Sequence, residues 1–588
     1  MVVEIAVPGP LPTLRKPEGE PTAVTAYAGE LLTSSSNLDD FDTFAMQKSL
    51  TEGWEGDAAA AYGNASRTTA RDAQAMGLTL RKISRAADDY AESLTALITR
   101  FDGLAERLRF LSSRRMQLIS DINAAGEATD AEIASLRQRA REVGTDISSL
   151  ASDDNILHAD AAVNERTMVA AFSSSDSLDK SRRQAAGTPD PADLAMQRPG
   201  SPTSEGSTPE QVNAWWGSLS GDERAAVIAA NPTVIGNGDG IPIEARNEAN
   251  RIVLDTDIEG LGLLDSRSEI SYEQNQALDN ARAAQAALNS GADRDDPITG
   301  LPLDPHLVMY DPYAFDGDGK IAISLGNPDS ADHVSVLVPG LTTNSGSATS
   351  LTTDAFNIYE SARYADPGAS VASMMWIGYD APSDWDSLTV AGEGRAEDGG
   401  GYLADTVDGL RASRDGDPAH LTVVGHSYGS TTVGHAASDH GLAADDIVLV
   451  GSPGAGGDVD NASDLGIGAD HVWAGNNSRD PVAALADDGW FGAHTLGGAG
   501  MGNDTAEDDF GANRFQAEST SRGDVRWFGD HSKYFDPDTE SLYNISQVVT
   551  GDYGDVVSAE HTYDPWYDGP QDPEWDRTPT VYETGSGQ

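Results

Sequence analysis

The feature that most constrains the fold is a short segment around residue 427. Leu421 to Val424 form an apolar run that indicates a buried parallel strand. Gly425-His426-Ser427-Tyr428-Gly429 follows and matches the pattern Gly-x-Ser-x-Gly, and the next residues, TTVGHAASDH, indicate a helix. Gly425 and Gly429 suit a tight turn that leaves no room for Cβ atoms. The segment therefore predicts a nucleophile elbow, in which the Ser427 hydroxyl stands above a sheet at the positive end of a helix.

A serine nucleophile needs a histidine base and an acid that orients it, and in a strand–elbow–helix fold the chain order is Ser, Asp or Glu, His. Asp480 follows the strand expected at 471–475, within Ser478-Arg479-Asp480-Pro481. Loops at the carboxyl ends of strands are where such a sheet assembles its site. Asp480 is the preferred acid because Pro481 would fix the turn that presents it, and Asp458 and Asp460 are the alternatives.

Three histidines downstream of Asp480 are candidates for the base. His531 lies in the polar segment Gly529-Asp530-His531-Ser532-Lys533-Tyr534-Phe535 and is preferred. His494 lies in a glycine-rich stretch, and His561 is close to the acidic C-terminal region. His426, inside the Gly-x-Ser-x-Gly segment, is expected to shape the turn and not to act as the base.

An oxyanion hole requires two backbone N–H donors. One is expected from Tyr428, the residue after the nucleophile. The strand expected at 333–338 ends in Pro339-Gly340-Leu341-Thr342-Thr343, and Leu341 is the preferred second donor, with Thr342 as the alternative. A further strand at 372–377 ends in GYDAP, at residues 378–382, which should line the same rim.

The first part of the chain has a different hydrophobic pattern, because apolar residues recur there at alternating spacings of three and four. They are Leu80, Ile83, Ala87, Tyr90, Leu94, Leu97, Phe101, Leu104, Leu108 and Leu111. This is the seam of a helix packed as in a coiled coil. A second seam runs from Ile133 to Leu150 after a break at Gly126, so an antiparallel helical hairpin is expected. Trp54-Glu55-Gly56 precedes the first seam, in a turn after a helix expected near 38–51.

Composition sets the domain boundaries that we expect. Residues 1–171 form the helical region, 172–209 a linker rich in Ser, Pro, Asp and Thr, 210–564 a second domain, and 565–588 a loosely ordered acidic tail. Trp215 and Trp216 are expected to pack against the next domain, with stacking on a ligand as the alternative. Ser220 and Glu223 predict a capping box that opens a helix ending near Asn231.

Charge and cysteine content exclude several classes of function. The 95 acidic residues outnumber the 38 basic ones and leave a net charge of -57, which argues against nucleic-acid binding and against docking on anionic membranes. The chain has no Cys, so disulfides, thiolate nucleophiles and Cys metal sites are excluded. Asp316-Gly317-Asp318-Gly319-Lys320 departs from a calcium loop at its fifth position and predicts a hairpin turn. No metal or cofactor is expected.

Targeting signals are not evident in the sequence. Residues 1–12 contain Glu4 and neither Lys nor Arg, so we expect no Sec signal peptide. No run of about 18 apolar residues is present, and no transmembrane helix is expected.

Several segments together resemble an actinobacterial α/β-hydrolase family long described as a domain of unknown function. They are AWWGSLSGDERAAVI, IGNGDGIP, ADHVSVLVPGLTT, WIGYDAP, AHLTVVGHSYGSTTVG, VLVGSPGAGG, HVWAG with SRDPV, and DHSKYF. The resemblance implies an α/β-hydrolase fold with a mostly parallel sheet behind an all-α region, and a triad of Ser427, Asp480 and His531. The Trp54-x-Gly56 hairpin resembles the small helical substrates of type VII secretion, although the Tyr-x-x-x-Asp/Glu export signal of those substrates is not evident.

The expected function is a serine hydrolase that acts on small-molecule or lipid esters through an acyl-enzyme. Two alternatives remain: a secretion-linked effector or surface factor whose helical region binds a helical partner, and a hydrolase-fold module that binds without catalysis. The location expected is the cytoplasm, or outside the cell by a non-Sec route.

Overall fold

The computed structural model describes most of the chain. The described residues are 9–48 without 10 and 18, 57–124, 129–173, 180–182, 191–266 without 205, 270–382, 393–483 without 415, 457 and 458, 501–561 without 538, and 572–582. They form two compact units, Met1–Asp190 and Pro191–Gln588. The Trp54-Glu55-Gly56 motif, Asp458 and His494 lie outside the described residues.

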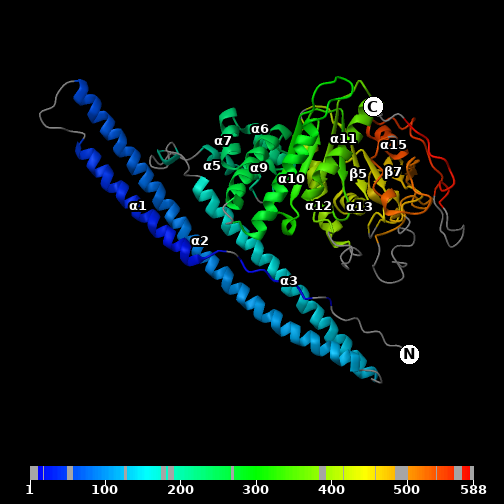
Figure 1. The fold of residues 1–588 in the computed structure, drawn as a ribbon, viewed down its shortest axis with the longest axis horizontal. Helices are drawn as coiled ribbons and strands as arrows, with labels where there is room; N and C mark the ends of the chain where they lie inside the picture. Colours follow the sequence, from blue (N-terminus) through cyan, green and yellow to red (C-terminus); the bar gives the residue numbers. More distant parts are fainter. Residues whose placement is uncertain are drawn as a thin grey trace. The chain divides into compact units, whose positions relative to one another are not determined.

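The described residues of the first unit include three long helices, α1 (Pro21–Lys48), α2 (Asp57–Ala124) and α3 (Asp130–Ser173). Within this unit α1 lies along the first half of α2, and α3 lies along its second half (Figure 1). The predicted helical region is therefore confirmed. The first helix begins at residue 21 and not near 38, and the third extends beyond the seam that ends at Leu150.

A ladder of ion pairs shows the antiparallel register of α2 and α3. Arg100, Arg107 and Arg114 of α2 bind Asp160, Asp153 and Asp146 of α3, with N–O distances of 2.5, 2.5 and 2.6 Å. One step further the charges are exchanged, and Arg139 of α3 binds Asp121 of α2 at 2.6 Å. Each step is seven residues on both helices, the repeat of a coiled coil. Leu97, Leu104 and Leu111 of the predicted seam are buried beside these ion pairs, and so is Leu118, one heptad further on.

The second unit opens with a layer of helices: α5 (Pro191–Met196), α6 (Pro209–Ser218), α7 (Gly221–Ala230), α8 (Pro232–Gly236), α9 (Ile243–Ser266) and α10 (Tyr272–Ala292). Trp215 and Trp216 are buried in it, and the Trp215 indole donates to the Ala195 carbonyl at 2.9 Å. The predicted linker at 172–209 therefore extends too far, because α5 packs against α7 and accepts this hydrogen bond from α6. The capping box of Ser220 and Glu223 is present at the start of α7.

Eight strands form one sheet in the order β1-β2-β4-β3-β5-β6-β7-β8. They are β1 (Pro305–Asp311), β2 (Lys320–Leu325), β3 (His333–Val338), β4 (Val371–Ile377), β5 (His420–His426), β6 (Asp446–Val450), β7 (Val472–Gly475) and β8 (Asn513–Arg514). The pairings of β1 with β2 and of β2 with β4 are antiparallel, and all others are parallel. The predicted α/β fold with a mostly parallel sheet is confirmed. Asp316–Gly319 lies in the turn of the β1–β2 hairpin, as expected.

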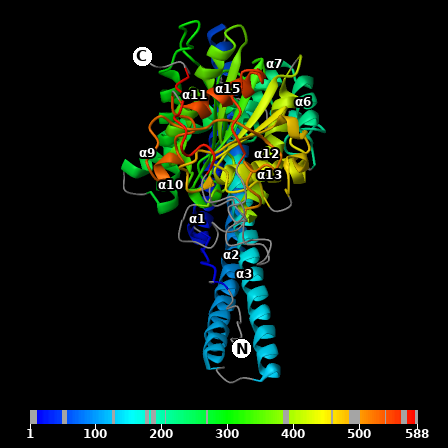
Figure 2. The same cartoon turned by 90° about the vertical axis from the view of Figure 1, so that its right-hand side faces the viewer.

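Helices cover both faces of the sheet, as Figures 1 and 2 show. Alternate strand residues point to opposite faces. Val423 packs in one core with α12 (Gly394–Ser413) and α13 (Tyr428–His440). Its neighbour Val424 packs in the other core with α11 (Ala348–Ala365) and α15 (Glu540–Val549). The buried β5 is thereby held from both sides, which makes its carboxyl end a rigid support.

The predicted loosely ordered tail is wrong for residues 572–582. The Arg577 guanidinium binds Glu540 of α15 at 2.5 Å, and Asp572 binds the buried Arg514 at 2.7 Å. The acidic segment packs here because Arg514 neutralises one of its carboxylates and its own Arg577 binds a carboxylate of α15. Among the residues that the structure describes, no helix is both long enough and apolar enough to cross a membrane.

Candidate active site

Ser427 lies in the sharp turn between β5 and α13, where the sequence predicts it. Its backbone has φ 57° and ψ −132°, a conformation that costs a non-glycine residue about 1–3 kcal/mol. Two contacts hold it there. The Ser427 N–H donates to the Val450 carbonyl at 3.0 Å, and the Ser427 carbonyl accepts from the Ser430 hydroxyl at 2.6 Å. The surrounding sheet and helix therefore impose the turn.

The glycines of the turn are required by space. A Cβ on Gly429 would lie 2.2 Å from the Val338 carbonyl oxygen, and one on Gly425 would lie 2.7 Å from the Ser430 Cα. A Cβ on Gly340, in the loop after β3, would lie 2.7 Å from the Ser427 Cβ and 2.8 Å from the Tyr428 nitrogen. The end of β3, the turn and the start of α13 thus come together at distances that only glycine allows.

Asp480 and His531, separated by 50 residues in the chain, are joined in the structure. Asp480 follows β7 and is buried, and its Oδ2 accepts from His531 Nδ1 at 2.7 Å. The other oxygen, Oδ1, accepts from the Val482 N–H at 2.7 Å. Because a carboxylate only accepts hydrogen bonds, the His531 proton sits on Nδ1, which leaves the lone pair on Nε2 to act as a base.

The end of β6 places this pair next to Ser427. Val450 accepts the hydrogen bond from Ser427, and the next residue is Gly451. A Cβ on Gly451 would lie 2.9 Å from Asp480 Oδ2 and 3.1 Å from His531 Nδ1. The serine turn and the histidine–aspartate pair therefore lie on either side of the same strand end.

His426 contacts His531 directly. Burial, helped by the neighbouring His531, lowers the pKa of His426 to about 3, so its ring is neutral at physiological pH. Its Nε2 donates to the His531 backbone carbonyl at 2.8 Å, and the two ring centroids are 4.8 Å apart. His426 thus positions the backbone of the candidate base.

The loop after β3 contains Leu341 and Thr342, the two candidates for the second oxyanion donor. The Thr342 N–H donates to the Pro382 carbonyl at 2.8 Å. Because that N–H already has an acceptor, Leu341 is favoured over Thr342 as the second donor. The Tyr379 hydroxyl donates to the Pro339 carbonyl at 2.7 Å, which fastens the segment after β4 to this loop. Residues 378–382 therefore border the same site, as the sequence predicts.

Comparison with known proteins agrees with the fold. A family model described as alpha/beta hydrolase matches residues 315–488. The uncharacterized protein Rv0963c of Mycobacterium tuberculosis is 33% identical over 238 residues, which is 39% of this chain and 83% of that protein. The chain belongs to the alpha/beta hydrolase family.

Another relative of this alpha/beta hydrolase is the uncharacterized protein Rv2079 of Mycobacterium tuberculosis. The two are 34% identical over 377 residues, which is 60% of this chain, and the chain spans 56% of the length of that protein. The uncharacterized protein Mb0988c of Mycobacterium bovis is 33% identical over 238 residues, 39% of this chain and 83% of its own. No solved structure matches this chain.

Asp460 and His561, the alternative acid and base that the structure describes, make other contacts. Asp460 is exposed, and its N–H donates to the Asp464 carboxylate. His561 contacts the Ala506 carbonyl at 3.3 Å. Among the described residues of the hydrolase, no three His, Asp or Glu side chains converge as a metal site.

Two features of the candidate site were not anticipated from the sequence. The first is Tyr534, whose hydroxyl donates to Asp480 Oδ2 at 2.7 Å and accepts from the Asn477 N–H at 3.0 Å. Tyr534 stands three residues after His531, in a segment that the sequence marks as polar, and nothing in the pattern signals its partner.

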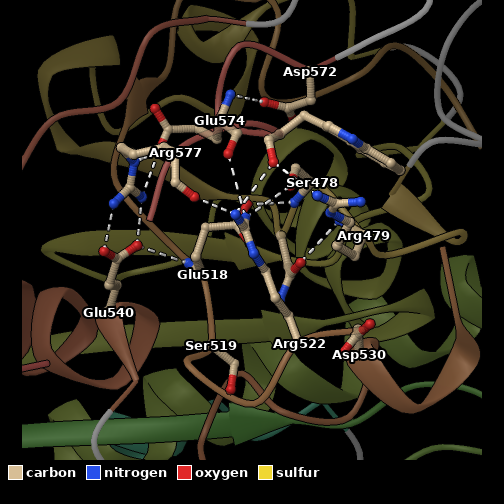
Figure 3. A network of polar contacts seen from close by, with 12 residues as sticks. Ser478, Arg479, Glu518, Ser519, Arg522, Asp530, Glu540, Asp572, Glu574 and Arg577 are labelled. Atoms are coloured by element: carbon tan, nitrogen blue, oxygen red, sulfur yellow. Dashed lines mark hydrogen bonds and ion pairs between the residues drawn. The ribbon is translucent and has the colours of Figure 1, made fainter. Parts of the chain in front are cut away.

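The second is a network of polar contacts around Arg479 and Arg522 that holds the loop of Asp480 (Figure 3). Arg479 donates to the Trp575 carbonyl at 2.9 Å, and its guanidinium carbon is 3.5 Å from the Trp575 ring centroid. Arg522 binds Glu518 at 2.5 Å and the carbonyls of residues 574, 575 and 577. Residues 572–577 are thereby fastened to the segment next to Asp480.

Proposed function

We propose that the chain is a serine hydrolase of carboxylic esters, lipid esters among them, that acts through Ser427, His531 and Asp480. The observation that carries the proposal is the 2.7 Å hydrogen bond between His531 Nδ1 and Asp480 Oδ2, next to the strained turn of Ser427. A preference for esters over peptides rests on analogy with other enzymes of this fold.

The mechanism follows from these groups. Ser427 Oγ attacks the ester carbonyl carbon while His531 Nε2 takes the hydroxyl proton, and the π electrons move onto the carbonyl oxygen. The Tyr428 and Leu341 N–H groups stabilise that oxyanion. Its collapse expels the alcohol, which leaves with the proton from His531. Water, activated by His531 in turn, then attacks the acyl-enzyme and releases the acid and free Ser427.

The test is covalent labelling with a fluorophosphonate, which reacts with activated serines. We expect one label per chain, abolished by Ser427→Ala and retained by Ser438→Ala on the same helix α13. Graded p-nitrophenyl esters then measure the preference for acyl chain length. A folded wild-type protein that takes up no label, yet binds an ester analogue, would support a non-catalytic binding module and contradict the proposal.

An export role for the first unit is a second candidate. The observation that favours it is that α1 and α2 pack against each other and directly flank the segment that contains Trp54 and Gly56. Expression in a mycobacterial host, with and without residues 1–190, tests it. Equal amounts of both forms in the culture filtrate would contradict this role.

A further inference from the structure

Three large apolar side chains are exposed immediately before His531. Val525, Trp527 and Phe528 have relative exposures of 68%, 65% and 58%. Among the described residues, no other segment of four consecutive residues has three exposed large apolar side chains. Scattered exposed apolar residues are ordinary, but a concentrated patch marks an interaction surface. We call residues 525–528 the apolar patch.

The apolar patch belongs to a closed loop. The Trp527 N–H donates to the Arg479 carbonyl at 3.1 Å, and the Gly523 N–H donates to the Asp530 carboxylate at 3.0 Å. A Cβ on Gly529 would lie 2.3 Å from Trp527 Nε1, so the indole covers Gly529. The loop ends where the His531 N–H donates to the Phe528 carbonyl at 3.2 Å. The exposed side chains are thus presented by a braced segment that adjoins the candidate base.

The charge around the patch differs from that of the rest of the chain. Residues 301–588 contain 11 Lys and Arg, and three of them, Arg522, Arg526 and Lys533, lie within residues 522–533. This stretch holds two acidic residues, Asp524 and Asp530, in a chain whose net charge is -57. Arg526 is itself exposed and stands between the apolar side chains. The acidity that would repel phosphate groups elsewhere is therefore absent from the patch.

We propose that the apolar patch docks the protein on a lipid surface with zwitterionic or uncharged head groups. Trp, Phe and Val beside an Arg are side chains that enter the interfacial layer of lipid, where the ring is buried and the charge meets phosphate. A strongly anionic surface would be disfavoured by the net charge of -57. A stable protein partner buries about 800 Å² on each side, far more than three side chains of one loop offer.

The location next to His531 connects docking to catalysis, and this part rests on the proposed function. A lipid layer on the patch brings ester groups to the edge of the sheet where Ser427 lies. The substrate class that follows is a lipid ester in an aggregate, and a short, freely dissolved ester would be handled without the patch.

Flotation of the full chain with phosphatidylcholine vesicles tests the proposal. We expect the wild type to float with the vesicles and V525S/W527S to bind at least about ten-fold more weakly. The matched control is Tyr272→Ser, which removes a side chain that is 86% exposed at the start of α10 and should bind as the wild type does. Fluorophosphonate labelling of V525S/W527S should be unchanged, which shows that the variant is folded.

The outcomes separate docking from catalysis. A wild type that stays off the vesicles, or a double variant that floats equally well, overturns the docking proposal. So does wild-type self-association that V525S/W527S abolishes without any vesicle binding, because the patch would then serve a protein partner. Ser427→Ala should still float. Vesicle binding without fluorophosphonate labelling overturns the proposed function and leaves docking intact.

Discussion

Tyr534 and Asp480 are joined by a hydrogen bond of 2.7 Å between two buried side chains. The oxygen that accepts it, Oδ2, also accepts from His531 Nδ1. Burial, and then the charge of Asp480, raise the pKa of Tyr534 well above its ordinary value, so the hydroxyl stays protonated and can only donate to the carboxylate. The orientation of the candidate acid is therefore set by three donors, of which His531 is one.

Replacing Tyr534 by Phe removes one donor to Asp480 and leaves the ring in place. We expect kcat for ester hydrolysis to fall about ten-fold with KM nearly unchanged, because the carboxylate loses part of its orientation and the base is held less well. The pH profile of kcat/KM should also move. The measurement is steady-state kinetics on a p-nitrophenyl ester.

A matched control for that variant exists in the same sheet. The Tyr553 hydroxyl donates at 2.7 Å to the buried Asp446, which also binds a histidine, His420, at 2.8 Å. Asp446 begins β6, whereas Asp480 follows the end of the parallel β7. The Asp446 cluster therefore lies at the amino ends of the parallel strands and the Asp480 cluster at their carboxyl ends. Tyr553→Phe should leave kcat unchanged, and an equal loss in both variants would show that Tyr534 acts only through stability.

Gly429→Ala should abolish fluorophosphonate labelling and lower the free energy of unfolding by about 1–3 kcal/mol. The added Cβ would lie 2.2 Å from the Val338 oxygen and 2.7 Å from the Pro339 oxygen, both backbone atoms that cannot rotate away. Urea unfolding followed by fluorescence measures the loss. Gly217→Ala is the control, because that helical position in α6 has open space and the change should stabilise the protein slightly. Normal labelling of Gly429→Ala would contradict the described approach of β3 to the turn.

Trp575→Ala tests the contact between the C-terminal segment and the site. The substitution removes the ring on which the Arg479 guanidinium stacks, 3.5 Å from the ring centroid. Because Asp480 is the residue after Arg479, the position of its carboxylate should change. We expect activity to fall about ten-fold, because small displacements of a positioned group are costly, and stability to fall by about 1–2 kcal/mol. Val581→Ala, an exposed position in the same segment, should change neither quantity.

Stability should depend on pH through His420 and Asp446. Burial by itself would lower the pKa of His420, but hydrogen bonds to Asp446 and to the Val549 carbonyl outweigh it and raise that pKa. Both ring nitrogens face acceptors, Nε2 at 2.8 Å and Nδ1 at 2.9 Å, so the folded state favours the protonated ring. Burial by itself would raise the pKa of Asp446, but the bonds from His420, Tyr553 and Trp473 lower it.

The direction of the effect follows for each group. The His420 contribution is complete below its ordinary pKa of about 6.5 and is lost as pH rises through its higher folded-state pKa. The Asp446 contribution is complete above about pH 3.9 and is lost as pH falls through its lower folded-state pKa. His420→Gln should therefore destabilise the second unit most between about pH 4 and 6.5, and less at pH 9.

Tryptophan fluorescence during urea unfolding at several pH values measures the stability of the second unit, since nine of the ten Trp residues lie in residues 191–588. His561→Gln serves as the control, because His561 faces a backbone carbonyl and no carboxylate in the described contacts. A loss of stability in His420→Gln that is the same at every pH would contradict a charged His420.

Much of the fold could be read from local pattern. The seam spacing that begins at Leu80 predicts α2 because a helix repeats its face every 3.6 residues. β3, β4, β5, β6 and β7 are visible as apolar runs because both of their faces are covered by helices. The two-residue β8 has no such run, and α1 begins 17 residues before the expected helix because its face is only weakly apolar.

For the site, the sequence by itself determined the strand, turn and helix around Ser427, because the Gly-x-Ser-x-Gly pattern acts over a few residues of backbone. It also limited the acid and the base to a few candidates through chain order. Only the tertiary structure decided that Asp480 binds His531 and that the Thr342 N–H donates to the Pro382 carbonyl. It also decided that Tyr534 donates to the same Asp480 carboxylate as His531. These contacts join residues 40 to 54 positions apart, and their geometry depends on how neighbouring strands end at one edge of the sheet. The same holds for the acidic tail, whose composition predicts loose order, whereas ion pairs with Arg514 and Glu540 hold residues 572–582 in place.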